Sequence, residues 1–111
     1  MTVPKKEWNK ASITELALLE AEKHGINSEK FLKTIACEVK KDEGGEWVAD
    51  AQSDIHGPHG RENSWGVMQI HLPSHPEITK SQAQDPAFAI PWAANEFAEG
   101  RANKWSCYRK L

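Results

Sequence analysis

Glu38 is the acidic residue whose place in the sequence best suits proton transfer. It ends a predicted helix that begins near Asn27 or Ser28 and whose apolar face carries Phe31, Leu32, Ile35, Ala36 and Val39. At about 100° per residue, Glu38 falls on the border of that face, in the turn where the helix dipole is negative. Both conditions raise the pKa of a carboxyl group, which suits a general acid working near neutral pH. Position alone leaves open a solvated glutamate at the end of a surface helix.

A second motif lies in residues 64–70, which read SWGVMQI and predict a short helix that the prolines of residues 73–76 end. This apolar stretch carries one amide, Gln69, which both donates and accepts hydrogen bonds. It follows residues 36–38 (ACE) and 51–53 (AQS), and it precedes residues 85–90 (DPAFAI), a helix with Ala94 and Asn95, and Gly100. This order of motifs, over residues 28–108, resembles the lysozyme-like lytic transglycosylase (SLT) domain family, which is related to goose-type lysozymes.

The resemblance implies roles for single residues of this chain. Glu38 takes the position of the family's catalytic acid and base, and Gln69 takes that of a substrate contact in the floor of the cleft. The other positions implied to contact substrate are Ser53, Met68, Asn95 and Tyr108, the last as the replacement for a family tyrosine that is not at its expected distance.

The implied reaction is cleavage of the β-1,4 bond between N-acetylmuramic acid and N-acetylglucosamine in peptidoglycan, with a 1,6-anhydro product. One glutamate then suffices and no cofactor is expected. The first alternative is a goose-type lysozyme, because hydrolytic glycosidases normally use two carboxylates. Candidates for the second carboxylate are Glu43, Glu46, Asp50, Asp54 and Glu62. Another alternative is a non-catalytic wall-binding module, because Val39 stands where the family usually has serine.

The aromatic residues favour a saccharide ligand independently of the resemblance. The chain has five tryptophans against three phenylalanines and one tyrosine. Indole rings match the apolar faces of sugars, while amides and carboxyls match their hydroxyl edges. Trp47 and Trp65 flank the segments of the predicted cleft and are expected to wall it. Trp92 shares a helix with Phe88 and is expected in the core.

Four histidines in two neighbouring polar segments, His56, His59, His71 and His75, offer imidazoles that in principle suit Zn²⁺. No cysteine or acidic ligand joins them in a recognised pattern. We therefore expect solvated loop histidines and no metal site.

The two cysteines are too few for a disulfide framework. Cys37 falls on the polar side of its helix and needs a cover, which the C-terminal segment with Cys107 can supply. A disulfide closing this ~70-residue loop and a pair of buried free thiols are both compatible with the sequence.

The rest of the pattern is mainly helical. Residues 12–15 (SITE) have the form of a capping box, and Gly25 closes the predicted helix. Asp85 and Pro86 open a helix over residues 87–99, with a bend at Pro91 and Gly100 at its end. Residues 40–63 predict a long loop with short strands around residues 46–48. We expect one mainly α domain over residues 1–111, lysozyme-like, with its cleft walled by this loop and room for a short β-hairpin.

Composition excludes two classes of partner. The formal charge is -2 over 111 residues and the mean hydropathy is -0.67, with no apolar run of membrane-spanning length. We expect no nucleic acid, no membrane insertion, and a monomer that acts on glycan strands at the cell wall, in the periplasm or outside the cell. The N-terminal residues MTVPKKEW lack the apolar stretch of a signal peptide, so phage delivery, another export route or a shortened chain is expected.

Overall fold

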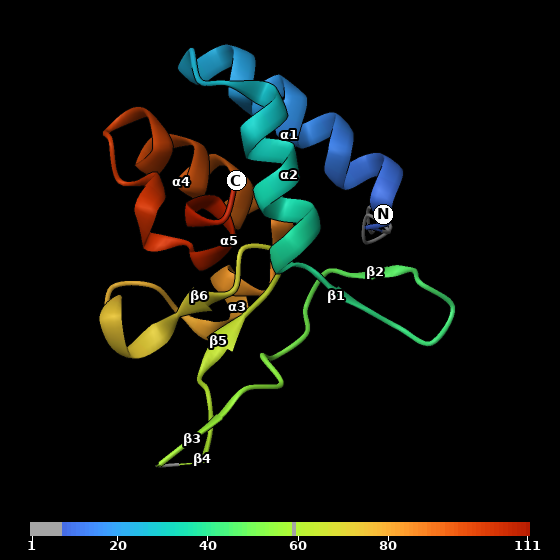
Figure 1. The fold of residues 1–111 in the computed structure, drawn as a ribbon, viewed down its shortest axis with the longest axis vertical. Helices are drawn as coiled ribbons and strands as arrows, with labels where there is room; N and C mark the ends of the chain where they lie inside the picture. The colour runs from blue at the N-terminus through green and yellow to red at the C-terminus, as the bar shows by residue number, and fades with distance from the viewer. Residues whose placement is uncertain (1–7, 59) are drawn as a thin grey trace, which may run out of the picture.

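The longer helices and three β-hairpins occupy opposite sides of the computed structural model, which describes residues 8–58 and 60–111 (Figure 1). The helices are α1 (Lys10–His24), α2 (Ser28–Glu38), α3 (Lys80–Ala83), α4 (Pro86–Ala98) and α5 (Ser106–Arg109), with 3₁₀ turns η1 (Leu72–Ser74) and η2 (Ala102–Lys104). The antiparallel hairpins pair β1 (Lys40–Lys41) with β2 (Trp47–Val48), β3 (His56–Gly57) with β4 (Gly60–Arg61), and β5 (Ser64–Trp65) with β6 (Ile70–His71). The prediction of a mainly α domain with room for a short hairpin is confirmed, and the described residues form three such hairpins.

The ends of the helices follow capping rules, with one correction. The predicted box at residues 12–15 is wrong, because Asn9 caps α1 one turn earlier and its side chain accepts from the Ser12 backbone N–H at 2.9 Å. Gly25 ends α1 in the left-handed conformation as predicted. Asn27 caps α2 and Asp85 caps α4, also as predicted.

The core lies between α1, α2 and α4. Alanines on α1 and α4 let these two helices approach closely, while Phe31 and Ile35 on α2 are fully buried beside them. Phe31 also meets Phe97 edge to face, with ring centroids 5.0 Å apart. The core therefore fixes α2, the helix that carries Glu38 at its end. Among the described residues, no helix is both long and apolar enough to cross a membrane.

The predicted helix over residues 64–70 is wrong, because this stretch is the hairpin β5–β6. Two of its residues have positive φ, which an α-helix forbids: Gly66 at 83° and Gln69 at 47°. The Gly66 backbone N–H donates to the Ala51 carbonyl at 3.0 Å, which fastens the hairpin to the preceding segment. Gly66 is thus the point at which the motif turns.

Gly66→Ala is expected to destabilise the fold by about 3 kcal/mol or more. A Cβ atom there would lie 1.8 Å from the Ala83 carbonyl oxygen, so backbone must move. Gly45→Ala is the matched control, because Gly45 has φ +82 but nothing within 4 Å of its added Cβ, and it should cost only about 1 kcal/mol. Urea unfolding of both variants measures the difference. Equal losses of unfolding free energy in the two variants would show that the close approach to Ala83 does not affect stability.

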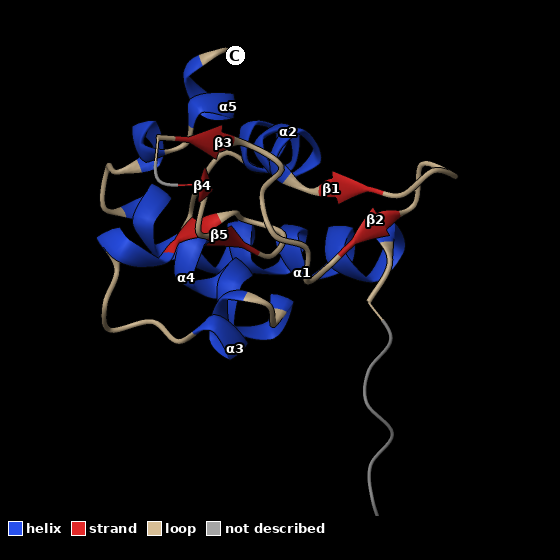
Figure 2. Cartoon of the chain, turned by 90° about the horizontal axis from the view of Figure 1, so that it is seen from below, coloured by secondary structure: helices blue, strands red, loops and turns tan. Residues whose placement is uncertain are grey.

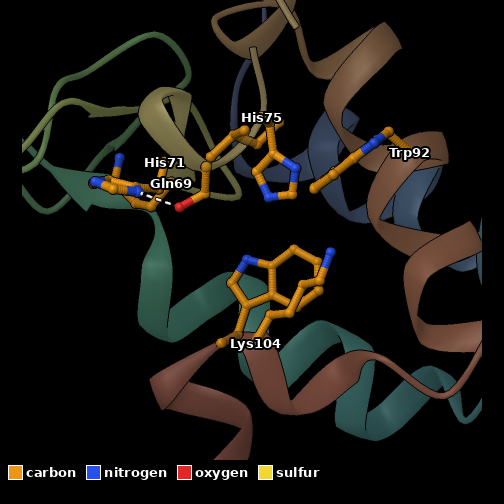
Figure 3. A pocket seen from close by; sticks show the side chains of 8 residues that line it. Gln69, His71, His75, Trp92 and Lys104 are labelled. Atoms are coloured by element: carbon orange, nitrogen blue, oxygen red, sulfur yellow. Dashed lines mark hydrogen bonds between the residues drawn. The ribbon is translucent and has the colours of Figure 1, made fainter. Parts of the chain in front are cut away.

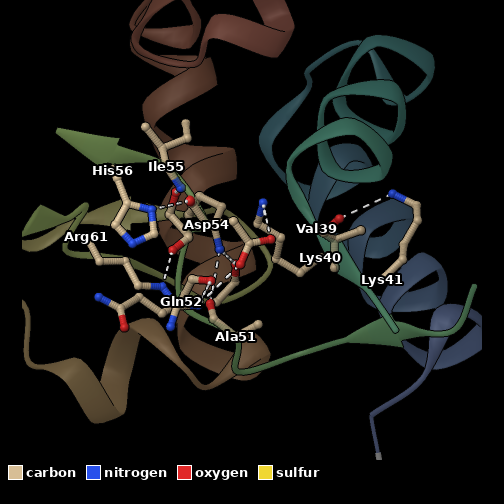
Figure 4. A network of polar contacts seen from close by, with 12 residues as sticks. Val39, Lys40, Lys41, Ala51, Gln52, Asp54, Ile55, His56 and Arg61 are labelled. Carbon is tan, nitrogen blue, oxygen red and sulfur yellow. Dashed lines mark hydrogen bonds and ion pairs between the residues drawn. The ribbon is translucent and has the colours of Figure 1, made fainter. Parts of the chain in front are cut away.

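The predicted loop over residues 40–63 is ordered by short strands and by polar contacts to Arg61 (Figure 4). The Arg61 guanidinium donates to the Ser53 carbonyl at 2.6 Å and to the Gln52 carbonyl at 3.2 Å, and it pairs with Asp54. Lys40 reaches the other oxygen of Asp54 at 3.2 Å. These contacts join Lys40 of β1 to Arg61 of β4 through residues 52–54.

Candidate functional site

Glu38 opens into a hollow of about 370 Å³, which we call the Glu38 hollow. Its walls come from the end of α2 and β1, from residues that flank the β3–β4 hairpin, from the β5–β6 hairpin, and from α5 with the turn before it. Figure 1 and Figure 2 both show α5 next to α2, and the two helices contact each other. Segments far apart in the sequence therefore meet at one carboxyl group.

The Glu38 carboxyl is partly buried, and its Oε1 accepts a hydrogen bond from the Cys107 backbone N–H at 3.4 Å. Burial is the main cause that raises its pKa above the ordinary 4.5, and the negative charge of Glu62 raises it further. The Cys107 N–H and the charges of Lys110 and Lys40 act in the opposite direction, and the net shift is upward. The group thus keeps its proton to higher pH than a solvated glutamate.

The end of α2 is held firmly at this point. The Val39 backbone N–H donates to the Ile35 carbonyl at 2.8 Å, and the Val39 side chain is buried in the core. Lys41 Nζ donates to the Ala36 carbonyl at 2.7 Å and to the Val39 carbonyl at 3.2 Å, which satisfies carbonyls that the helix end leaves free. Val39, the residue that follows Glu38, therefore belongs to the core.

A disulfide joins Cys37 to Cys107, with Cα atoms 5.9 Å apart, and the described residues contain no free cysteine. Of the two alternatives that the sequence left open, the structure has the disulfide. Both of its cysteines lie beside the site. Cys37 directly precedes Glu38, and Cys107 provides the N–H that meets the Glu38 carboxyl. The bond therefore fastens α5 against the end of α2.

Gln69 lines the Glu38 hollow as the resemblance implies. Its Nε2 donates to the Gly66 carbonyl at 2.9 Å and to the Ala51 carbonyl at 3.1 Å, which fixes the amide within the turn. The positive φ of a residue other than glycine costs free energy, and such positions cluster at functional sites. Two hydrogen bonds to backbone carbonyls hold the amide in place.

Two serines and a second carboxylate share the hollow. Ser53 lines it as implied, and its Oγ accepts from the Ile55 backbone N–H at 3.1 Å. Ser64 Oγ donates to Glu62 Oε1 at 2.7 Å. Glu62 was one of the five candidates for a second carboxylate in the predicted loop, and only the folding of β3–β4 places it in the same hollow as Glu38.

The other predicted contacts lie elsewhere. Met68 is fully buried in the core, so its side chain does not reach the hollow. Asn95 is exposed on α4, outside the residues that line the hollow. Tyr108 packs against Phe97, with ring centroids 5.4 Å apart, and does not line the hollow.

The predicted tryptophan walls are displaced as well. Trp47 is 9% exposed, covers the core, and lines a different hollow of about 800 Å³ on another part of the surface. Trp65 donates through Nε1 to Asn63, and Lys80 Nζ lies 4.1 Å from the centre of its ring. Trp65 does not line the Glu38 hollow. The tryptophan that does line it is Trp105, whose Nε1 donates to the Met68 carbonyl at 2.7 Å. Sequence spacing carried no signal for Trp105.

Trp92, predicted in the core, is only partly buried. It packs against the core, but it also lines a second hollow of about 500 Å³. Of the four histidines, His71 and His75 line that hollow, His56 is exposed on β3, and His59 lies outside the described residues. In residues 8–58 and 60–111, no group of three or more histidine, cysteine or acidic side chains is placed to hold a metal ion.

The raised pKa of Glu38 predicts that the protein loses stability as the pH rises. Between the ordinary value of 4.5 and the raised value, the folded state binds more protons than the unfolded state, so the free energy of unfolding falls there with pH. Glu38→Gln carries no charge and escapes this loss. Its melting temperature, relative to the wild type, should rise from about pH 4 to about pH 8.

Glu29→Gln is the control for this prediction, because hydrogen bonding and charge attraction to Lys33 lower the pKa of Glu29. Its relative melting temperature should change little with pH, and in the opposite direction. A Glu38→Gln curve parallel to that of the wild type from acid to neutral pH would contradict the raised pKa.

The hollow thus brings together Glu38, Gln69 and Ser53 of the predicted residues, and adds Glu62 and Trp105. Lys40, Lys104 and Lys110 supply positive charge around them. Compared with family models, curated proteins and solved structures, the chain matches none.

Proposed function

We propose that the protein is a lytic transglycosylase that cleaves the β-1,4 bond between N-acetylmuramic acid and N-acetylglucosamine in peptidoglycan. The observation that carries the proposal is the partly buried Glu38, whose raised pKa and place in an open hollow suit a general acid. The resemblance of the motifs around Glu38 and Gln69 supports the same reaction. The enzyme acts at the cell wall and needs no cofactor for this chemistry.

Glu38 acts twice in the proposed reaction. Its protonated carboxyl gives a proton to the glycosidic oxygen as the bond to the muramyl C1 breaks. The resulting carboxylate then takes the proton of the muramyl C6 hydroxyl as that oxygen bonds to C1 and closes the 1,6-anhydro ring. Glu38 therefore gives one proton and regains one in each cycle, and no water is consumed.

The lining of the hollow supports a saccharide as the ligand. Trp105, which is 6% exposed, borders the hollow beside the amide of Gln69 and the largely buried hydroxyl groups of Ser53 and Ser64. Sugar rings need this combination of apolar face and polar edge. The N–H of Trp105 and the N–H₂ of Gln69 already donate to carbonyls of the chain, so both groups are fixed before a ligand arrives.

A goose-type lysozyme activity is the second candidate, and Glu62 is the observation that favours it. Hydrolysis normally needs a second carboxylate near the first, and Glu62 lines the same hollow and is close enough to raise the pKa of Glu38. Ser64 already engages one Glu62 oxygen. We favour the transglycosylase because its chemistry is complete without Glu62.

Glu62→Gln separates the two candidates on purified peptidoglycan sacculi. A transglycosylase should still release soluble fragments that end in 1,6-anhydro sugars, each lighter by one water than the corresponding hydrolysis product. A hydrolase that depends on Glu62 should lose release in this variant and give hydrated ends in the wild type. Sacculi that bind the wild type but release no fragments would contradict both enzymes and favour the binding module.

A further inference from the structure

We infer that the hollow beside Trp92 is a subsite for a carboxylate carried on the glycan. The inference rests on the proposed function, because it assigns to the same cleft a preference for an anionic saccharide. The subsite is the second hollow, of about 500 Å³, which we call the Trp92 hollow (Figure 3). Neither the role proposed for Glu38 nor that of Gln69 uses it.

The Trp92 hollow borders on the Glu38 hollow. Both are lined by Gln69, His71, Lys104 and Trp105. A chain of sugars that places one glycosidic bond at Glu38 therefore reaches the Trp92 hollow past Gln69 and Trp105. Figure 3 shows Gln69 and His71 on one side, Trp92 on the other, and His75 between them.

The aromatic rings of this hollow form a packed group. Trp92 meets Trp105 edge to face with centroids 5.9 Å apart, and His75 meets Trp92 with centroids 5.0 Å apart. Lys104 Nζ lies 5.7 Å from the centre of the Trp92 ring. An aromatic ring with a cation near its face suits a ligand that carries a negative group.

The titratable side chains that line the Trp92 hollow are basic: His71, His75 and Lys104, with no carboxylate among the described lining residues. Two of these three side chains also pair with carboxylates that do not line the hollow. Glu77 pairs with His75 at 3.5 Å but is mostly exposed, and Glu96 lies 3.4 Å from Lys104 Nζ while it is also bonded to Arg101. His71 Nδ1 is paired with Ser74 Oγ at 2.8 Å.

Lys104 is the group best placed to select the ligand. Its ammonium carries three donors, and it lines both hollows. Because Arg101 also neutralises Glu96, a ligand carboxylate can share Lys104 without leaving Glu96 unpaired. On a muramyl glycan the carboxylate comes either from the lactyl ether or, where that group is amidated, from the attached peptide.

The test measures binding to the Glu38→Gln variant, which holds glycan without cleaving it. Three probes are compared by calorimetry: a neutral chito-oligosaccharide, a glycan of the same length with free lactyl groups, and that glycan with its peptides. We expect a carboxylate-bearing glycan to bind about tenfold more tightly than the neutral one. Tighter binding without peptides assigns the lactyl carboxylate, and tighter binding with peptides assigns the peptide.

Lys104→Met, added to the Glu38→Gln variant, should remove the preference for a carboxylate-bearing glycan. Methionine keeps an apolar side chain over Trp92 but has no charge. Lys80→Met is the matched control, because Lys80 also covers a tryptophan, Trp65, outside both hollows, and it should keep the preference. Equal affinity for neutral and anionic glycans, or a preference that survives Lys104→Met, overturns the subsite while leaving the proposed function standing. Failure of all three probes to bind overturns both.

Discussion

Glu38→Gln should lower the release of fragments from peptidoglycan by roughly a thousandfold, because glutamine cannot give a proton to the leaving oxygen or take one from the C6 hydroxyl. The substitution preserves shape, and the burial that raises the pKa of Glu38 favours an uncharged side chain at this place. The fold should therefore persist. Soluble fragments counted against time, with circular dichroism on the same sample, measure both effects.

Glu29→Gln makes the same change on the same helix and should cleave like the wild type. Glu29 is exposed on α2 and pairs with Lys33 at 2.9 Å, away from the hollow. Turnover by Glu38→Gln within tenfold of the wild type would remove Glu38 from the reaction. Equal losses in both variants would point to general damage to α2.

Removing the disulfide should have the second largest effect. Cys37→Ala combined with Cys107→Ala is expected to lower the free energy of unfolding by roughly 4 kcal/mol, because the bond closes a long loop in the unfolded chain. That loss corresponds to a fall of roughly 15 °C in melting temperature for a domain of this size. Cleavage should also decline, since the segment that supplies the Cys107 N–H to Glu38 is no longer fastened to α2.

Reductant provides the internal control for the disulfide. Dithiothreitol should lower the melting temperature and activity of the wild type toward those of the double variant, and it should leave the double variant unchanged. A double variant that melts within a few degrees of the wild type would show that packing between α2 and α5 holds the site without the bond.

The helices were predictable where local signals set them. Asn27, Asp85 and Pro86 mark helix starts by their own capping chemistry, and the apolar spacing of α2 is long enough to define a face. Glu38 could be placed on the border of that face for the same reason. The early start of α1 was missed because the N-cap is Asn9 and not Ser12. The Asn9 side chain accepts a hydrogen bond from the backbone N–H of Ser12 in the first turn.

The hairpins and much of the site depend on contacts between distant segments. Gly66 and Gln69 take positive φ because the Ala51 carbonyl and the Ala83 backbone surround that turn, which local spacing does not reveal. Glu62 reaches the hollow only through the pairing of β3 with β4. Short helices such as α3 and α5 have too few residues for an apolar period, although the Thr79 and Gln82 capping box marks α3.

The tryptophans show the same limit. Their number favours an aromatic ligand surface, but which ring faces the cleft depends on the last helix returning to the motif near Gln69. Trp105 does so through its hydrogen bond to Met68, 37 residues away in sequence. Trp47 faces a different hollow, although its sequence position next to the predicted cleft segments appeared more favourable.

Digestion of purified peptidoglycan in water enriched in heavy oxygen tests the role of Glu38 most directly. If Glu38 alone carries both proton transfers, the fragments end in 1,6-anhydro sugars, lack one water and contain no oxygen from the solvent. Fragments with hydrated ends that carry the heavy oxygen from the moment of release would contradict the transglycosylase and assign a hydrolase that uses a second carboxylate.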